Sequence, residues 1–206
     1  PPPPPLVPNP GDTQLVYFSR AAYIAMPPRG PMNDRQRLVG RLKNNHNRED
    51  VFATIRSLEP LKDEWEFAHC IAALGEVHED GRARALLGEM PRRGLRPSVY
   101  CFNACIRAVG RAGQWREALK LLDEMERARV APTNHSFSAA LSALDKAAEA
   151  DRALDLLRKI RAPDGFCYSP VIHALANASP SRAAEALELL EEALALRLPA
   201  RDLTGC

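Results

Sequence analysis

The stretch "GRAGQWREALKLLDEMERARVAPT", residues 110–133, decides the fold of this chain. Gly113 interrupts one helical pattern, and a second pattern begins directly after it. Pro132 ends that second pattern, because proline cannot continue a helix. The stretch contains no pair of groups that could form a catalytic site, so its regularity requires a structural explanation. The apolar residues of the second pattern recur at the spacing of one helix face, at Ala118, Leu119, Leu122 and Met125.

The same landmarks recur along the chain at intervals of about 35 residues. Each unit has an aromatic residue in its first half and an alanine in its second half. Because these landmarks shift together, the sequence predicts repeated units of two helices. One helix pair cannot bury its apolar faces alone, so the pairs must stack into an all-α solenoid. The aromatic landmarks are Phe67, Phe102, Phe137 and Tyr168, and the alanines are Ala83, Ala118, Ala153 and Ala186.

The repeat predicts four units, at residues 64–98, 99–133, 134–164 and 165–200. Residues 1–31 are rich in proline and are expected to be largely disordered. Residues 201–206 leave room only for the start of a further unit.

A shorter, degenerate unit is predicted at residues 32–63. Matching its "VGR" to the "VGR" at 109–111 would place charged and polar residues on buried sites, namely Arg35, Gln36 and Arg48. An offset of 67 residues is preferred, because it places seven apolar residues on the apolar sites. These residues are Leu38, Val39, Leu42, Val51, Phe52, Ile55 and Leu58.

Composition excludes several classes of protein. The 28 Lys and Arg residues nearly balance the 26 Asp and Glu residues, so net charge alone does not indicate a polyanionic partner. The five cysteines form no CxxC pair, which argues against a disulfide scaffold and favours Cys101 and Cys105 as apolar filler over a metal site. No run of 18 apolar residues exists, so no membrane-spanning helix is expected.

Three segments resemble the pentatricopeptide repeat family more closely than the tetratricopeptide family: "CFNACIRAVGRAG" at 101–113, "WREALKLLDEM" at 115–125 and "RVAPT" at 129–133. The "GLRPS" at 94–98 is similar to the same closing element. The resemblance covers about 32–200 and is strongest in 64–164. It implies an α-solenoid that binds single-stranded RNA in mitochondria or chloroplasts, one nucleotide per repeat.

In that family, a residue early in the first helix and the last residue of the repeat select the base together. A pair of Asn103 and Thr133 resembles a pyrimidine reader. A Ser138 hydroxyl beside the Asp164 carboxylate offers acceptors to the N1–H and amine of guanine. The pairs that contain an alanine should discriminate poorly. The remaining pairs are Ala68 with Ser98, Ser169 with Ala200 and, in the degenerate unit, Gln36 with Asp63.

Flat side chains also recur at the repeat period, two residues before each aromatic landmark. Such rings could stack on splayed bases, or they could pack between adjacent repeats instead. They are Trp65, Tyr100, His135 and Phe166. Two cations, Arg111 and Lys146, hold equivalent places late in the first helix, where the family resemblance implies contact with the RNA backbone. Glu76 and Asn177 interrupt this series, so a small dependence on salt is expected.

Two functions therefore compete. The first is binding of single-stranded RNA in organellar RNA processing, stability or translation. The second is a protein-binding scaffold or structural subunit of an organelle complex, which the short array and balanced charge favour. Catalysis is not expected, because the adjacent His69 and Cys70 point about 100° apart on a helix. The tail typical of zinc deaminases is absent from this sequence, and no catalytic residue, metal or cofactor is predicted.

Overall fold

The computed structural model describes residues 33–43, 45–178 and 182–196, and every regular element in these ranges is an α-helix. The segments 1–31 and 201–206, and Ala200, lie outside the described residues. The first helices of the successive pairs are α2 (Asp34–Leu42), α4 (Glu64–Glu76), α6 (Val99–Arg111), α8 (Asn134–Lys146) and α10 (Gly165–Ala176). The second helices are α3 (Arg48–Leu58), α5 (Asp80–Arg92), α7 (Trp115–Arg127), α9 (Ala150–Lys159) and α11 (Ala183–Ala195).

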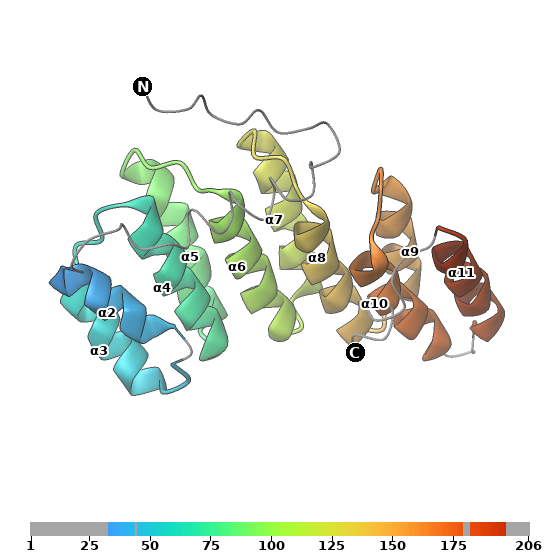
Figure 1. Ribbon diagram of the computed structural model, residues 1–206, viewed down its shortest axis with the longest axis horizontal. Helices are drawn as coiled ribbons and strands as arrows, with labels where there is room; N and C mark the ends of the chain where they lie inside the picture. The colour runs from blue at the N-terminus through green and yellow to red at the C-terminus, as the bar shows by residue number, and fades with distance from the viewer. Residues whose placement is uncertain (1–32, 44, 179–181, 197–206) are drawn as a thin grey trace, which may run out of the picture.

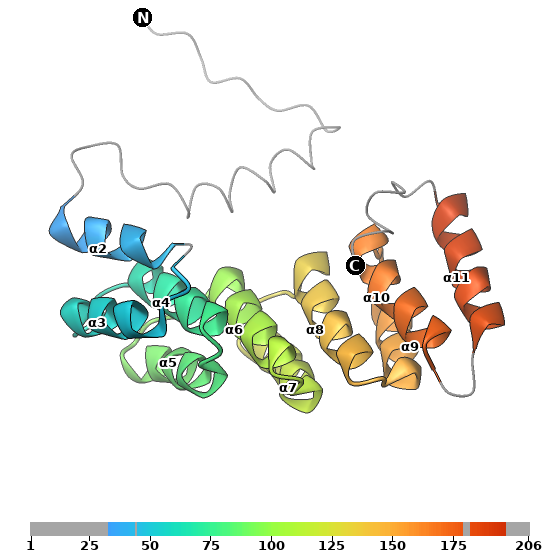
Figure 2. The same ribbon diagram turned by 90° about the horizontal axis from the view of Figure 1, so that it is seen from below.

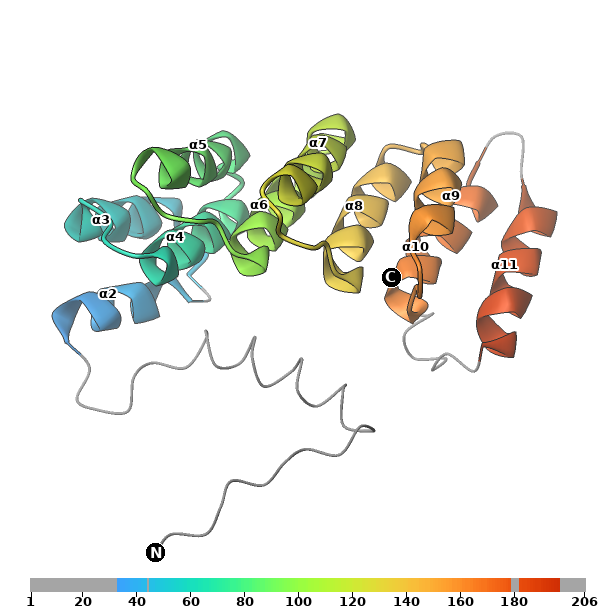
Figure 3. The same ribbon diagram turned by 90° about the horizontal axis from the view of Figure 1, so that it is seen from above.

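The helix pairs stack along one axis, in the order of the sequence (Figure 1). Helices α4, α6, α8 and α10 lie side by side in one layer, while α5, α7 and α9 form a second layer behind it (Figures 2 and 3). Each first helix of this layer contacts the first helix of the next repeat. This arrangement confirms the predicted all-α solenoid, and it places the early residues of every first helix on one layer.

The core lies between the two layers and is continuous along the array. In the 99–133 unit, the buried residues include Phe102, Ile106, Leu122 and Met125. In the degenerate unit, Val39, Leu42, Val51 and Leu58 are buried and Leu38, Phe52 and Ile55 are partly buried. The hydrophobic pattern therefore identified the inward faces of the helices in these units.

Two glycines allow the first helices to approach each other closely. A Cβ atom on Gly75 of α4 would lie 2.9 Å from the Cβ of Ala108 on α6. A Cβ atom on Gly110 of α6 would lie 3.1 Å from the Cβ of Ala143 on α8. The glycines are 35 residues apart, so the same contact recurs from one repeat to the next.

The turn between the two helices of a repeat has the same backbone conformation in three successive units. Its key residue has a positive φ, at 59° for His78, 71° for Gly113 and 55° for Ala148. The amide that follows each of these residues donates to a carbonyl five residues earlier, as in the bond from Gln114 N to Val109 O at 3.0 Å. The helix break predicted at Gly113 is this turn.

Ala148→Gly is expected to increase the free energy of unfolding by about 1 kcal/mol, because a Cβ atom disfavours the left-handed region and glycine relieves that cost. Urea denaturation followed by circular dichroism would measure the change. Ala112→Gly is the matched control: Ala112 is exposed beside the equivalent turn but has a φ of −76°. The control should lose stability, and a loss in both variants would contradict the strain argument.

Candidate functional site

The residues predicted to read bases early in the first helices fall on one layer but differ in accessibility. Asn103 on α6 is largely buried, and within the described part of the chain its Oδ1 atom has no hydrogen-bond donor. Ser138 on α8 is half-buried, whereas Ser169 on α10 is buried. Ala68 on α4 is only 1% exposed and so has almost no surface to offer a base. The layer therefore presents Asn103 and Ser138 as its best candidate readers.

Three of the residues predicted to close a repeat, Ser98, Thr133 and Asp164, are the N-caps of the helices that follow. Asp164 caps α10 by accepting a hydrogen bond from the Cys167 amide at 3.1 Å. Thr133 caps α8, and its amide donates to Ser136 Oγ at 3.1 Å. Ser98 precedes α6 in the same way. These residues thus have a structural role that the sequence analysis missed, although Ser, Thr and Asp before a helical pattern are its usual signal.

The predicted pair in the degenerate unit, Gln36 and Asp63, also takes part in helix capping. The Gln36 side chain accepts a hydrogen bond from the Asn33 amide at 3.0 Å, within a capping box at the start of α2. Asp63 caps α4 by accepting from the Glu66 amide at 2.9 Å.

Ser138 and Asp164 come together with an exposed ring. Ser138 Oγ donates to the backbone carbonyl of Phe166 at 3.1 Å. Asp164 precedes Phe166 by two residues at the start of α10. Phe166 is 52% exposed. The Ser138 oxygen keeps lone pairs that can still accept hydrogen bonds. A hydroxyl, a carboxylate and an open aromatic ring therefore share one edge of the layer.

The first two flat side chains are linked by a third ring that the sequence analysis did not include. The His69 ring centroid lies 4.7 Å from that of Trp65 and 6.0 Å from that of Tyr100. His69 Nδ1 lies 2.8 Å from the Trp65 carbonyl oxygen, and burial lowers the pKa of His69, so the ring is neutral at pH 7. The spacing of four residues from Trp65, which places two side chains on one helix face, could have revealed this contact.

The four flat side chains differ in how much of their surface is exposed. Trp65 is half-buried against His69 of its own helix, a contact within one repeat that covers part of the ring. Tyr100 is 41% exposed and Phe166 is 52% exposed, and His135 also lies in the exposed class. Tyr100, His135 and Phe166 therefore offer surface to a ligand, and Trp65 offers less.

The two cations predicted to contact the RNA backbone, Arg111 and Lys146, differ in their partners. Arg111 on α6 forms an ion pair with Glu76 on α4, with 2.8 Å between Arg111 Nη1 and Glu76 Oε2. Arg107, which the sequence analysis did not single out, lies 4.0 Å from the same carboxylate. Lys146 is exposed at the end of α8. Glu76, which interrupts the series of cations, thus forms an ion pair with the next repeat.

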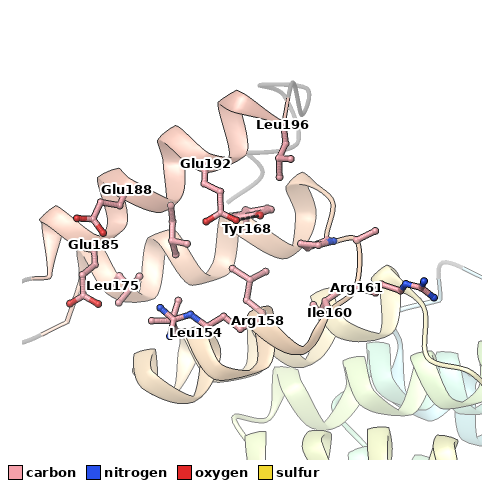
Figure 4. Close-up of a pocket in the computed structure, with 14 residues that line it drawn as sticks. Leu154, Arg158, Ile160, Arg161, Tyr168, Leu175, Glu185, Glu188, Glu192 and Leu196 are labelled. Atoms are coloured by element: carbon pink, nitrogen blue, oxygen red, sulfur yellow. Dashed lines mark hydrogen bonds between the residues drawn. The ribbon is translucent and has the colours of Figure 1, made fainter.

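Helix α9 ends early and leaves a hollow of about 720 Å³ between α9, α10 and α11 (Figure 4). It has 10 residues, whereas α5 and α7 each have 13. Leu154 and Ile160 line one side, and Tyr168 Oη donates to Glu192 Oε1 at 2.8 Å on the other. The lining of the hollow mixes leucines with charged side chains, among them Arg158, Glu188 and Glu192.

Among the described residues, the buried thiols are unreactive and no metal-binding cluster forms. Burial raises the pKa of Cys70, Cys105 and Cys167 to about 12, so these thiols are protonated at neutral pH and are poor nucleophiles. In the same ranges, no three His, Cys, Asp or Glu side chains gather where they could hold a metal ion. None of the described helices has the length and apolar character needed to cross a bilayer.

Comparisons with known proteins agree with this geometry. Residues 97–146 match the model of the PPR repeat family, and no curated protein sequence matches significantly. The structure is similar to that of the pentatricopeptide repeat protein PPR10 in complex with an 18-nt psaJ RNA element, with a TM-score of 0.68 and 24% identity over 80% of this chain and 25% of that one. PPR10 from maize gives a TM-score of 0.61 and 22% identity over 89% of this chain and 27% of that one.

The chain therefore spans about a quarter of the length of these solved structures. At such identities the structural likeness shows the fold, and the family model adds the repeat sequence within 97–146. Residues 97–146 therefore carry a sequence match to the PPR repeat family, within a helical-repeat fold similar to that of PPR10.

Proposed function

We propose that the layer of first helices binds single-stranded RNA, one nucleotide to each repeat. The grouping of Ser138, Asp164 and the exposed Phe166 ring carries this proposal, because it offers both hydrogen-bond acceptors and a stacking surface to one base. The RNA complex of the structurally similar PPR10 supports it. Tyr100 and His135 repeat the aromatic position in the two preceding units.

The two best-formed pairs should select different bases. The buried Oδ1 atom of Asn103 needs a donor, which the N3–H of uracil or the amine of cytosine would supply. Thr133 is the partner of Asn103 in the proposed pyrimidine site. The hydroxyl of Ser138 and the carboxylate of Asp164 suit the N1–H and amine of guanine. A strand running 5′ to 3′ from the first repeat to the last should present a pyrimidine followed by guanine.

The biological setting forms a further part of the proposal. The family resemblance supports a role in the processing, stability or translation of RNA in a mitochondrion or chloroplast. Lys146 and, when it is released from Glu76, Arg111 would contact the phosphate backbone of that RNA. The affinity should therefore fall as salt concentration rises.

A protein-binding scaffold is the second candidate function. The observation that favours it is the apolar surface of the last repeat, where Leu187, Leu194 and Leu196 are 59%, 52% and 55% exposed. The hollow beside α9 adds further apolar surface at the same end of the described array (Figure 4). A protein bound there could act without RNA or together with it.

Base reading is tested by a competition assay in which the base opposite Ser138 and Asp164 is varied inside a fixed single strand. We expect guanine to bind more tightly than adenine by about 1–3 kcal/mol, because adenine has no N1–H for Asp164. Ser138→Asn should shift the preference toward a pyrimidine, since it recreates the Asn and Asp pair that resembles the uracil reader of the family.

Ser142→Asn is the matched control, because Ser142 is half-buried one turn further along the same helix. It should leave the base preference unchanged. Duplex RNA and single-stranded DNA serve as competitors that should bind more weakly. Equal affinity for all four bases in the wild type and in Ser138→Asn would contradict base selection by Ser138 and Asp164, but it would not contradict the solenoid fold.

A further inference from the structure

Glu76 lies among basic side chains that could regulate RNA binding. This inference rests on the proposed function. Glu76 closes α4, and its carboxylate receives a two-point contact from Arg111 of the next first helix. Arg111 Nη1 lies 2.8 Å from Glu76 Oε2, and Arg111 Nη2 donates to Oε1 at 2.9 Å. Arg107 Nη2 lies 4.0 Å from Oε1. One carboxylate therefore holds two guanidinium groups of α6.

This cluster borders a hollow of about 400 Å³ in the first-helix layer. Glu76 and Arg107 line the hollow together with Lys43, His46 and the half-open ring of Tyr100. The hydrogen bond from Arg111 lowers the pKa of Glu76 against the opposing effect of burial, and the charges of Arg107 and His46 lower it further. Glu76 is thus an ionised carboxylate among several basic side chains.

A guanidinium group binds a carboxylate and a phosphate with the same fork of two N–H donors. We infer that Glu76 takes the place of an RNA phosphate and competes with it for Arg107 and Arg111. A phosphodiester that enters the hollow must displace Glu76 or be repelled by it. Glu76 therefore lowers the RNA affinity of this repeat, and it sets that affinity through the two arginines.

The exchange is feasible because both partners reach the solvent. The side chain of Glu76 is 29% exposed and that of Arg111 is 30% exposed. Ion pairs of this kind contribute little to stability, since water already solvates much of each charge. The fold consequently does not depend on keeping Glu76 and Arg111 together. Removing only the charge of Glu76 should free Arg107 and leave Arg111 with its 3.3 Å hydrogen bond to the Gly75 carbonyl, without disrupting α4 or α6.

Glu76→Gln in the full chain tests the inference, with a labelled uridine homopolymer as the single-stranded probe. We expect the affinity at low salt to rise roughly tenfold, because two cations become available to phosphates. The slope of log affinity against log salt concentration should steepen by up to about 1.4, or about 0.7 for each cation on a single strand. Filter binding or fluorescence anisotropy over a salt series gives both quantities.

Glu117→Gln is the matched control. Glu117 pairs with Arg84 at 3.1 Å between the second helices α7 and α5, its side chain is 28% exposed, and the substitution changes the net charge equally. Affinity and slope should stay at the wild-type values in this control. Adding Arg107→Gln to Glu76→Gln should remove part of the gain in affinity and slope.

Three outcomes would overturn the inference, and they differ from one another. An equal gain in Glu117→Gln would show a general effect of net charge. Unchanged RNA binding with a lower melting temperature in Glu76→Gln would show that Glu76 only stabilises the packing of α4 against α6. A wild-type chain and a Glu76→Gln variant that both fail to bind any single strand would overturn the proposed function, and the inference with it.

Discussion

Phe102→Ala is expected to lower the free energy of unfolding by about 3–5 kcal/mol, the range typical of a large aromatic side chain truncated in a core. Phe102 is buried on α6, the central first helix of the described array, where it contributes to the continuous core between the two layers. The substitution removes apolar contacts and leaves a cavity that the packed helices around it can close only in part. Urea denaturation followed by circular dichroism measures the loss.

Phe166→Ala provides the comparison, since it makes the same chemical change on α10 at a residue that is 52% exposed. Its unfolding free energy should differ from that of the wild type by less than about 0.5 kcal/mol. The two variants separate the structural and functional uses of phenylalanine, because Phe166→Ala should weaken RNA binding instead. A neutral effect of Phe102→Ala would contradict the proposed packing of α6.

Arg35→Met is expected to lower the free energy of unfolding by about 3 kcal/mol at pH 7, because it leaves the Glu66 carboxylate without its charged partner. Arg35 of α2 donates to both oxygens of Glu66 on α4, at 2.6 Å and 2.7 Å. The Glu66 side chain is only 4% exposed. Methionine retains much of the apolar stem of arginine, so the change in stability reports on the lost charge and on the lost hydrogen bonds to the Leu58 and Pro60 carbonyls.

The dependence on pH gives this prediction a second readout. Burial opposes ionisation of Glu66, but the hydrogen bonds from Arg35 and the Lys62 amide outweigh it and lower the pKa of Glu66. A lowered carboxyl pKa adds stability above the unfolded value of about 4.3, and that stability is lost as the pH falls through the folded value. The cost of Arg35→Met should therefore shrink in acid, where Glu66 is protonated.

Arg37→Met is the control on the same helix. Arg37 lies 3.4 Å from Asp34, and the two side chains are 68% and 97% exposed. Removing such a pair should change stability by less than about 0.5 kcal/mol at any pH. A similar loss of unfolding free energy in Arg35→Met and Arg37→Met would show that the buried pair of Arg35 and Glu66 stabilises the fold no more than an exposed pair does.

The fold could be predicted from the sequence because its determinants are local and periodic. The spacing of Ala118, Leu122 and Met125 identified the buried face of one helix, and the recurrence of landmarks such as Phe102 required stacking. In the degenerate unit, the burial pattern served better than the short identity around residues 39–41. The charged Arg35 still reaches the interior edge, where Glu66 compensates for its burial.

The candidate site was harder to predict because its partners belong to different repeats. The spacing placed Arg111 correctly late in α6, but only the packing of α4 against α6 brings Glu76 into contact with it. His69 bridges Trp65 and Tyr100 for the same reason. The shortening of α9 follows from a unit of 31 residues, 134–164, yet the hollow that it leaves depends on the position of α11.

The close approach at Gly75 and Gly110 bears on the shape of any strand that lies along this layer. Packed helices lie about 8–10 Å apart, and a glycine contact favours the lower end of that range. Stacked bases in a nucleic acid rise only about 3.4 Å per step. A strand that advances one base per helix must therefore be stretched until its bases no longer touch one another. In the proposed complex, the two glycines would set the distance between successive bases, and a bulkier residue at either position would increase that distance.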